Sequence, residues 1–368
     1  MRTIEGNLYT REGMLPGRLH TGADGRITGI TRLPADQVPD RLILPGFIDL
    51  HVHGGGGADL MEGADAARIL SRTHARFGTT SLVATTVSAA HEDLKKVLTA
   101  IAPLCDTRHP QSARILGVHL EGPYLNRVKL GAQPDQIQHA DASRIRELCA
   151  LAPIRILTLA PEMLSNQALL QELSAAGIRL QIGHSNGSYE QGKRALEQGV
   201  SGFTHLFNAM SGLHHREPGM VGAALAHAEY AEIIPDLLHV HPGAVLAALR
   251  SIPGLYGVSD ATAATGMPDG TYLLGSHQVH KCMGGVRLKD GTLAGSCLTM
   301  DQALRNLVKI GLPLQTASDC LSLRPARYLG LTDRGQLAAG MMADLVVLDN
   351  DLKIRQVWVE GENIELTA

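Results

Sequence analysis

Eight apolar segments of strand length recur between residues 43 and 260, separated by segments with helical periodicity. This alternation is typical of parallel βα units. Because the segments are almost continuously apolar, each strand should be buried on both faces, as in a parallel sheet covered by helices. Eight such strands favour an α/β fold closed into a (β/α)8 TIM barrel, with an open doubly wound sheet as the alternative. The expected strands are 43–51, 79–87, 114–120, 154–159, 178–183, 200–205, 232–238 and 255–259.

The two ends of the chain follow a different pattern. Short β-like runs replace the long alternation there, with turns such as Asp24-Gly25 between them. One barrel of roughly 250 residues plus a small attachment accounts for a chain of 368 residues. We therefore predict a small β-sandwich domain built from residues 1–44 and 335–368, and a hydrolase barrel of residues 45–334.

The amino-acid composition limits the kinds of molecule that this protein is expected to bind. The 33 basic and 36 acidic residues nearly cancel and form no long run of like charge, so neither nucleic acid nor a membrane surface is expected to bind. The sequence shows no targeting segment and no stretch of about 18 apolar residues, which predicts a cytoplasmic protein. The five cysteines are widely spaced without a CxxC pair, so no disulfide framework is expected. The expected partner is a small molecule.

The first expected strand ends in the pair His51 and His53. Residues two apart in an extended chain project from the same face, so both imidazoles can reach one ion. An H-x-H pair alone is a weak signal, because ordinary core or surface histidines also occur at this spacing. The prediction of a metal site therefore depends on what the other strands carry at their ends.

Ionisable side chains also stand at the ends of four other expected strands. In a parallel barrel every strand points its C-terminal end at one mouth, so these side chains should converge. Each could have a structural role alone, as a hydrogen-bonded core histidine, a helix cap or a turn former. Buried together, they would be electrostatically costly without a cation. These residues are Glu121, His184, His205 and Asp260.

This set of ligands predicts amide hydrolysis. Imidazole nitrogens and carboxylate oxygens suit zinc and other borderline divalent ions. Such a cation can lower the pKa of bound water to roughly 7 and polarise a substrate carbonyl. Asp260 would then take a proton as hydroxide attacks and deliver it to the leaving nitrogen.

Longer motifs extend across nearly the whole chain. They include PGFIDLHVHG, HLEGP, IGHS, THLFNAM, REPG, VSDAT, LAGSCLTM and GMMADLVVLD. Together they resemble the N-acetylglucosamine-6-phosphate deacetylases of the amidohydrolase superfamily. The resemblance implies a (β/α)8 barrel with a small β domain made from both termini, usually in a homodimer. It also implies an amino-sugar metabolic enzyme that converts N-acetyl-D-glucosamine 6-phosphate to D-glucosamine 6-phosphate and acetate.

The resemblance also assigns the metal ligands. His51 and His53 match those members that carry a full H-x-H and hold a second ion, with Glu121 bridging the two ions. Asp260 is the catalytic acid and base. One or two divalent ions are therefore expected per chain, zinc first, with iron or another divalent ion as the alternative. In the family pattern the principal metal is held by Glu121, His184 and His205.

For the substrate, the resemblance assigns Asn208 and the backbone amide of Ala209 to the phosphate. Arg216 joins them from the partner subunit, and its guanidinium suits a phosphate well. His239 corresponds to the sugar-contacting histidine, although His241 lies only two residues on and is the alternative.

One position departs from the family pattern and leaves the substrate open. Gln133 stands where many members carry a histidine that contacts the substrate; its amide can still donate a hydrogen bond. It either replaces that contact or changes the selectivity among N-acetylated amino-sugar phosphates. Two further alternatives are a cyclic amide hydrolase of the dihydroorotase or hydantoinase type, which generally needs a bridging lysine, and a barrel that binds without catalysis.

Overall fold

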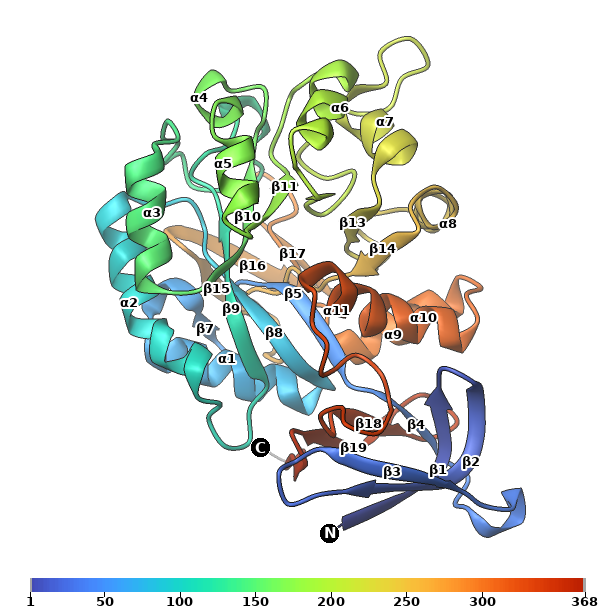
Figure 1. Cartoon of the computed structure of the whole chain (residues 1–368). Helices are drawn as coiled ribbons and strands as arrows, with labels where there is room; N and C mark the ends of the chain where they lie inside the picture. Colours follow the sequence, from blue (N-terminus) through green and yellow to red (C-terminus); the bar gives the residue numbers. More distant parts are fainter. Residues whose placement is uncertain (1, 367–368) are drawn as a thin grey trace.

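A ring of parallel strands forms the centre of the molecule in the computed structural model, which describes residues 2–366 (Figure 1). Six strands pair in the order β12-β11-β10-β9-β8-β5, and β13 pairs with β14 in parallel. These strands are almost entirely buried, as their apolar sequences predict. Their bounds are β5 Phe47–Val52, β8 Thr79–Thr85, β9 Arg114–Glu121, β10 Ile154–Leu159, β11 Arg179–Ile182, β12 Gly202–Phe203, β13 Tyr230–Ile233 and β14 Gly254–Gly257.

Backbone hydrogen bonds close the ring at both gaps between these two sheets. The Leu206 amide donates to the Glu232 carbonyl (2.9 Å) and joins the end of β12 to β13. The Asp260 amide donates to the His51 carbonyl (3.0 Å) and joins the end of β14 to β5. The predicted TIM-type barrel of eight parallel strands is thereby confirmed, and the strand ends meet at one mouth.

Two expected strands need correction. The segment 43–51 is two strands, because the chain leaves the terminal sheet after β4 (Leu42–Pro45) and enters the barrel at β5. The break falls at Gly46, where a Cβ atom would lie 2.2 Å from the Thr80 side chain. The strand expected at 232–238 ends at Ile233, because Pro235 and the turn at Asp236 follow it.

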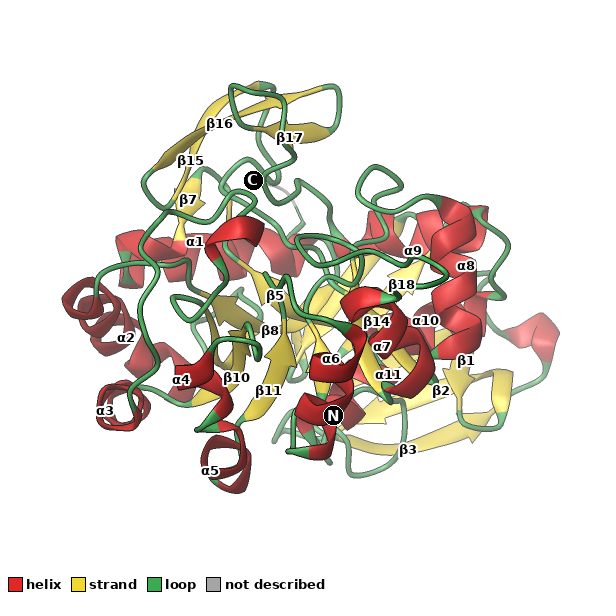
Figure 2. Ribbon diagram, turned by 90° about the horizontal axis from the view of Figure 1, so that it is seen from above, coloured by secondary structure: helices red, strands yellow, loops and turns green. Residues whose placement is uncertain are grey.

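Helices surround the barrel strands on the outside (Figure 2). In α9 the buried residues Met300, Ala303, Leu304 and Leu307 follow the spacing of one helical face, which packs toward the barrel. Among the described residues, no helix has the length and apolar character needed to cross a membrane. The helices are α1 Ala64–Arg76, α2 His91–Asp106, α3 Ala142–Leu151, α4 Leu164–Gln167, α5 Leu170–Ala175, α6 Tyr189–Glu197, α7 Gly219–His227, α8 Pro242–Ser251, α9 Met300–Lys309, α10 Leu314–Leu321 and α11 Leu323–Leu329.

Shorter elements lie in the loops, and all but η1 belong to loops of the barrel. A three-stranded antiparallel sheet of β15, β16 and β17 projects at one edge of the molecule when it is viewed from above (Figure 2). The short elements are η1 Ala35–Gln37, β6 Gly54–Gly55, β7 Ala58–Asp59, η2 Leu60–Glu62, η3 Arg127–Lys129, β15 Gly270–Leu274, β16 His277–Cys282 and β17 Gly285–Arg287.

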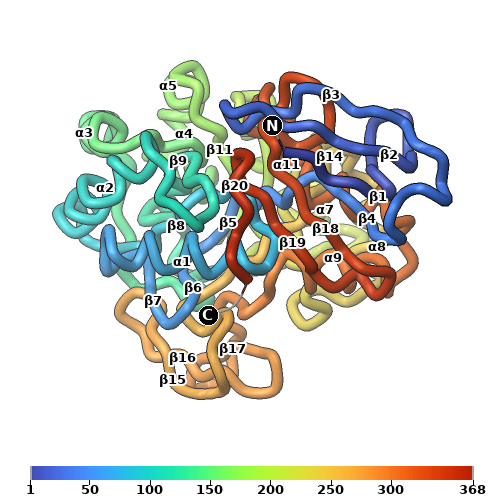
Figure 3. The backbone as a smooth tube through the Cα atoms, turned by 90° about the horizontal axis from the view of Figure 1, so that it is seen from below, coloured from blue at the N-terminus to red at the C-terminus, as the bar shows by residue number. Residues whose placement is uncertain are grey.

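The two ends of the chain together form a seven-stranded sheet in the order β20-β19-β18-β4-β1-β2-β3 (Figure 3). Its inner residues share one core, in which Leu8 and Leu19 from one end of the chain pack with Val347 and Trp358 from the other. Figure 1 shows this sheet beneath the barrel. Its strands are β1 Arg2–Thr10, β2 Gly13–Thr21, β3 Ile27–Arg32, β4 Leu42–Pro45, β18 Leu345–Leu348, β19 Ile354–Val359 and β20 Glu362–Asn363.

A buried arginine ties this sheet to the barrel. The Arg334 guanidinium donates to the Ser81 hydroxyl on β8 (2.8 Å) and pairs with the Asp344 carboxylate (3.2 Å). Both charged side chains are almost fully buried. Burial raises the pKa of Asp344 to about 6, although the Arg334 charge opposes the rise. The buried charge of Asp344 is therefore stable only with the Arg334 charge beside it.

We predict that Arg334→Ala destabilises the protein by about 3–5 kcal/mol, because it leaves Asp344 buried without a cation. Guanidinium unfolding of the two proteins measures the difference. The matched control is Arg32→Ala, whose exposed pair with Glu12 should contribute less than about 1 kcal/mol. Equal losses in the two variants would contradict the account.

Candidate metal centre

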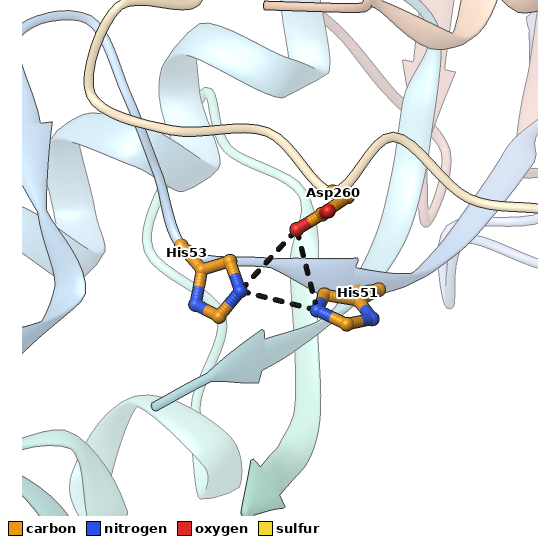
Figure 4. A group of neighbouring side chains, drawn as sticks. All are labelled: His51, His53 and Asp260. Atoms are coloured by element: carbon orange, nitrogen blue, oxygen red, sulfur yellow. Dashed lines mark hydrogen bonds and ion pairs between the residues drawn. The ribbon is translucent and has the colours of Figure 1, made fainter. Parts of the chain in front are cut away.

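His51, His53 and Asp260 meet at the mouth of the barrel (Figure 4). The Nε2 atoms of the two histidines are 3.1 Å apart. Asp260 Oδ1 lies 3.4 Å from Nε2 of His51 and 3.3 Å from Nε2 of His53. Both histidines project from the end of β5, and Asp260 comes from the loop after β14. The alternate spacing of the H-x-H pair therefore places both rings on one side, as extended geometry requires.

Glu121, His184 and His205 form a second group beside the first. Glu121 Oε1 lies 3.2 Å from Nε2 of His184 and 3.1 Å from Nε2 of His205. Glu121 is the last residue of β9, and the two histidines follow β11 and β12. Three strands of one parallel sheet thus bring together side chains that are as many as 84 residues apart in the sequence.

The Glu121 carboxylate connects the two groups. Its Oε1 atom faces His184 and His205, whereas its Oε2 atom lies 3.2 Å from Nε2 of His53 and 3.5 Å from Nε2 of His51. Each oxygen can therefore serve one group. The two groups could therefore share this carboxylate if each held a cation.

The hydrogen bonds behind the rings test whether a cation fits. His53 Nδ1 lies 3.1 Å from the Thr85 carbonyl, and His184 Nδ1 lies 2.8 Å from the Lys129 carbonyl. Because a carbonyl only accepts, Nδ1 must carry a proton in both rings, and Nε2 of the neutral ring presents a lone pair to the centre. Lone pairs that face one another across little more than 3 Å, with carboxylate oxygens between them, form a donor set that fits a divalent cation.

Three of the converging residues have a strained backbone. His184, His205 and Asp260 have φ values of 47°, 31° and 51°, in the left-handed region that non-glycine residues rarely adopt. Each follows a barrel strand directly or within a few residues. Such strain clusters at functional sites, where surrounding packing maintains it. Here it turns the side chains into the mouth of the barrel.

Both carboxylates at the centre favour their ionised form. Burial alone would raise the pKa of Asp260, but the His51 and His53 side chains hold it below its usual range. Burial also opposes ionisation of Glu121, whose pKa is nevertheless lowered by His51, His184 and His205. Both groups are therefore acceptors at neutral pH.

A cavity of about 220 Å³ opens above these residues. Asn208, Ala209 and His239 stand in its wall, and Leu274 at the end of β15 also lines it. His51 is fully buried behind the cavity wall. The other predicted metal and catalytic residues that line the cavity are His53, Glu121, His184, His205 and Asp260.

Two predicted residues lie apart from this cavity. Arg216 is exposed and lines a different cavity, together with Lys129; its guanidinium contacts the neighbouring His215 (2.8 Å). His241 accepts a hydrogen bond from the Gly243 amide at the start of α8. Of the two alternatives for the sugar-contacting histidine, only His239 faces the cavity. Its ring is held by Asp236 (2.7 Å).

Gln133 is fixed in the cavity wall by hydrogen bonds at both ends of its amide. The oxygen accepts from the Ser88 amide (2.7 Å), and the nitrogen donates to Glu121 Oε2 (2.5 Å). A primary amide carries two N–H donors, so one donor remains for a ligand in the cavity. Gln133 thus contacts the Glu121 carboxylate at the oxygen that faces His51 and His53.

Two buried residues beside the centre are not among the site residues predicted from the sequence. Glu232 accepts a hydrogen bond from Nδ1 of His51 (3.0 Å), and His119 packs against the His51 ring with centroids 4.7 Å apart. Burial lowers the pKa of His119 to about 3, so its ring is neutral. The available signal was a charged residue inside an otherwise apolar strand, at Glu232 in β13.

Comparison with known proteins agrees with this geometry. Residues 42–364 match the Amidohydrolase family. The chain is 38% identical over 366 residues to the N-acetylgalactosamine-6-phosphate deacetylase of Escherichia coli O157:H7, with 96% of this chain and 97% of the relative covered. It is 39% identical over 354 residues to the N-acetylglucosamine-6-phosphate deacetylase of Lysinibacillus sphaericus, with 92% and 91% covered.

Solved structures show the same architecture. A variant of N-acetyl-D-glucosamine-6-phosphate deacetylase from Mycobacterium smegmatis, in complex with N-acetyl-D-glucosamine-6-phosphate, superposes with a TM-score of 0.91 at 34% identity and covers 98% of each chain. The N-acetylglucosamine-6-phosphate deacetylase from Thermotoga maritima gives a TM-score of 0.91 at 34% identity and covers 99% of each chain.

We predict that Glu121→Ala loses at least one equivalent of bound metal per chain, because the carboxylate serves both groups of histidines. Elemental analysis after desalting measures the change, and circular dichroism checks that the variant is folded. Glu162→Ala is the matched control, since Glu162 bonds Ser185 and Asn126 instead of the centre. Wild-type metal content in Glu121→Ala would rule out the bridging role.

Proposed function

We propose that this chain, which belongs to the amidohydrolase family and within it to the N-acetylglucosamine-6-phosphate deacetylases, hydrolyses N-acetyl-D-glucosamine 6-phosphate to D-glucosamine 6-phosphate and acetate. The observation that carries this proposal is the Glu121 carboxylate between two histidine groups, with Asp260 beside it at the cavity. The reaction cleaves a linear amide and belongs to amino-sugar metabolism.

We propose zinc as the resident ion, with one or two per chain. Glu121, His184 and His205 would hold the first ion, and His51 and His53 a second. The supporting observation is the nitrogen and oxygen donor set, which zinc accepts at about 2.0–2.2 Å. A divalent cation held there lowers the pKa of water and polarises an amide carbonyl.

Asp260 is the proposed acid and base. Among the described residues that line the cavity, Asp260 and Glu121 are the two carboxylates, and both oxygens of Glu121 already face histidines. Asp260 is ionised and can take the proton from the water that attacks the carbonyl carbon. It then passes this proton to the nitrogen of the sugar as the carbon–nitrogen bond breaks.

The phosphate is proposed to bind at Asn208 and the backbone amide of Ala209, and His239 to contact the sugar. These three residues share one wall of the cavity. Arg216 lies on an exposed loop, away from the cavity at the metal centre of its own chain. This position supports the proposal that it reaches the site of a partner chain in a homodimer. A cytoplasmic location is proposed because a phosphorylated sugar is too polar to cross an apolar bilayer unaided.

A second candidate substrate is N-acetyl-D-galactosamine 6-phosphate. The 38% identity to a deacetylase of that name favours it, as does Gln133 in the cavity wall. The two sugars differ in the configuration of one hydroxyl, and a buried amide can discriminate between the two positions of that hydroxyl by hydrogen bonding. The cyclic amide alternative gains no support, since no lysine lines the cavity among the described residues.

Acetate release tests this function. We expect turnover of N-acetyl-D-glucosamine 6-phosphate by the metal-loaded protein, and much slower turnover of the sugar without its phosphate. The galactosamine isomer in the same assay ranks the two candidate substrates. Hydrolysis of dihydroorotate or a hydantoin without acetate release from either sugar phosphate would overturn the proposal.

A substitution tests the proton-transfer role. Asp260→Asn should keep the metal but lower kcat by on the order of 10² to 10⁴, because the amide cannot accept the proton. Acetate release and elemental analysis on the same preparation measure both properties. If the variant turns over at nearly the wild-type rate, another group moves the proton.

A further inference from the structure

We infer that a directed chain of buried hydrogen bonds runs through the barrel core, ends at Glu232, and fixes which nitrogen of His51 faces the metal centre. Glu232 is then a positioning residue for that centre. This inference rests on the proposed metal-dependent function but concerns side chains below the centre.

The hydrogen-bond chain consists of seven side chains from around the barrel. All of them are fully buried, so their polar groups bond within the core, apart from Nδ1 of His119, which has no hydrogen-bond partner. The successive contacts are His119 Nε2 to Thr158 Oγ1 (2.6 Å), Thr158 Oγ1 to Thr204 Oγ1 (2.7 Å), Thr204 Oγ1 to Gln181 Oε1 (2.7 Å), Gln181 Nε2 to Tyr256 Oη (2.8 Å), Tyr256 Oη to Glu232 Oε1 (3.4 Å) and Glu232 Oε2 to His51 Nδ1 (3.0 Å).

The direction of these bonds follows from counting protons. The Gln181 amide oxygen only accepts, so the Thr204 hydroxyl must donate to it. Thr204 has then used its proton and must accept from Thr158. Thr158 has likewise used its proton, so the Nε2 atom of His119 donates to it.

The other end of Gln181 determines the direction toward Glu232. Its amide nitrogen donates to the Tyr256 hydroxyl, which leaves the tyrosine proton for Glu232. The opposite amide orientation would use that proton on Gln181 and deprive Glu232 of a donor. Glu232 also receives the backbone N–H of His205 (3.2 Å). The carboxylate is therefore an acceptor toward every polar neighbour.

This direction fixes the His51 ring. Because Glu232 accepts, Nδ1 of His51 carries a proton, and in the neutral ring the Nε2 lone pair faces His53, Asp260 and Glu121. A carboxylate behind a ligating histidine holds the ring orientation and makes its other nitrogen a better ligand. His51 differs here from His53 and His184, whose Nδ1 atoms donate to backbone carbonyls.

The hydrogen-bond chain also connects His51 to most strands of the barrel. Its members come from β5, β9, β10, β11, β13 and β14, together with the residue that follows β12. A buried network whose members are all satisfied is rigid, whereas one broken link leaves a polar group without water. A change well below the centre should therefore reach His51 through Glu232.

Zinc titration of the full chain tests the inference. Competition with a chelator should show that Glu232→Gln lowers the affinity for one of two zinc ions by roughly 10–100-fold and leaves the affinity for the other unchanged. Tyr256→Phe should lower the affinity for the same ion by a smaller factor, because it removes the hydroxyl that donates to Glu232. The matched control is Tyr9→Phe, which removes a tyrosine donor to a carboxylate outside the network, Asp319 (3.0 Å), and should change neither ion.

Three outcomes would overturn the inference. They are wild-type zinc affinity in Glu232→Gln, equal effects of the two tyrosine substitutions, and a single zinc ion in the wild-type chain. If Glu232→Gln does not fold, the two tyrosine variants decide the matter. Zinc binding does not require turnover, so a chain that shows this pattern without releasing acetate would refute the proposed function and leave the inference standing.

Discussion

The site depends on one electrostatic constraint, which is that lone pairs and carboxylates buried together need positive charge between them. Glu121 presents one oxygen to His184 and His205 and the other to His51 and His53, all within 3.5 Å. Without positive charge, from a cation or from protonated histidines, this arrangement would bury acceptors against acceptors at a cost of several kcal/mol per group. The backbone strain at the strand ends and the hydrogen bonds behind the rings are understood as supports for this arrangement.

The barrel supplies that support because of its parallel topology. All strands end at the same mouth, so residues 84 positions apart approach within 3.1 Å. Backbone hydrogen bonds from Leu206 and Asp260 close the ring directly beside the predicted ligands. The terminal sheet is bound to the opposite end through Arg334, well away from the cavity. Stability and chemistry are thus placed on different faces of the same barrel.

The fold and the convergence of the ligands could be predicted because both follow from periodic patterns. An apolar run indicates a buried strand, and a polar residue at the C-terminal end of that strand is expected at the mouth of the barrel. The break at Gly46 could not be predicted, because it depends on the close approach of Thr80 from another strand. Glu232 was missed because a carboxylate inside an apolar strand shows its role only when its partner, His51, is seen across the barrel. The environment of Gln133 likewise required Ser88 and Glu121 to be in place.

The most direct test of the central claim is anomalous diffraction from crystals of the zinc-loaded protein, measured on both sides of the zinc absorption edge. The account predicts a peak about 2.0–2.2 Å from Glu121 Oε1 and from the Nε2 atoms of His184 and His205. Zinc found only on exposed histidines, such as His214 and His215, with none beside Glu121, would contradict it.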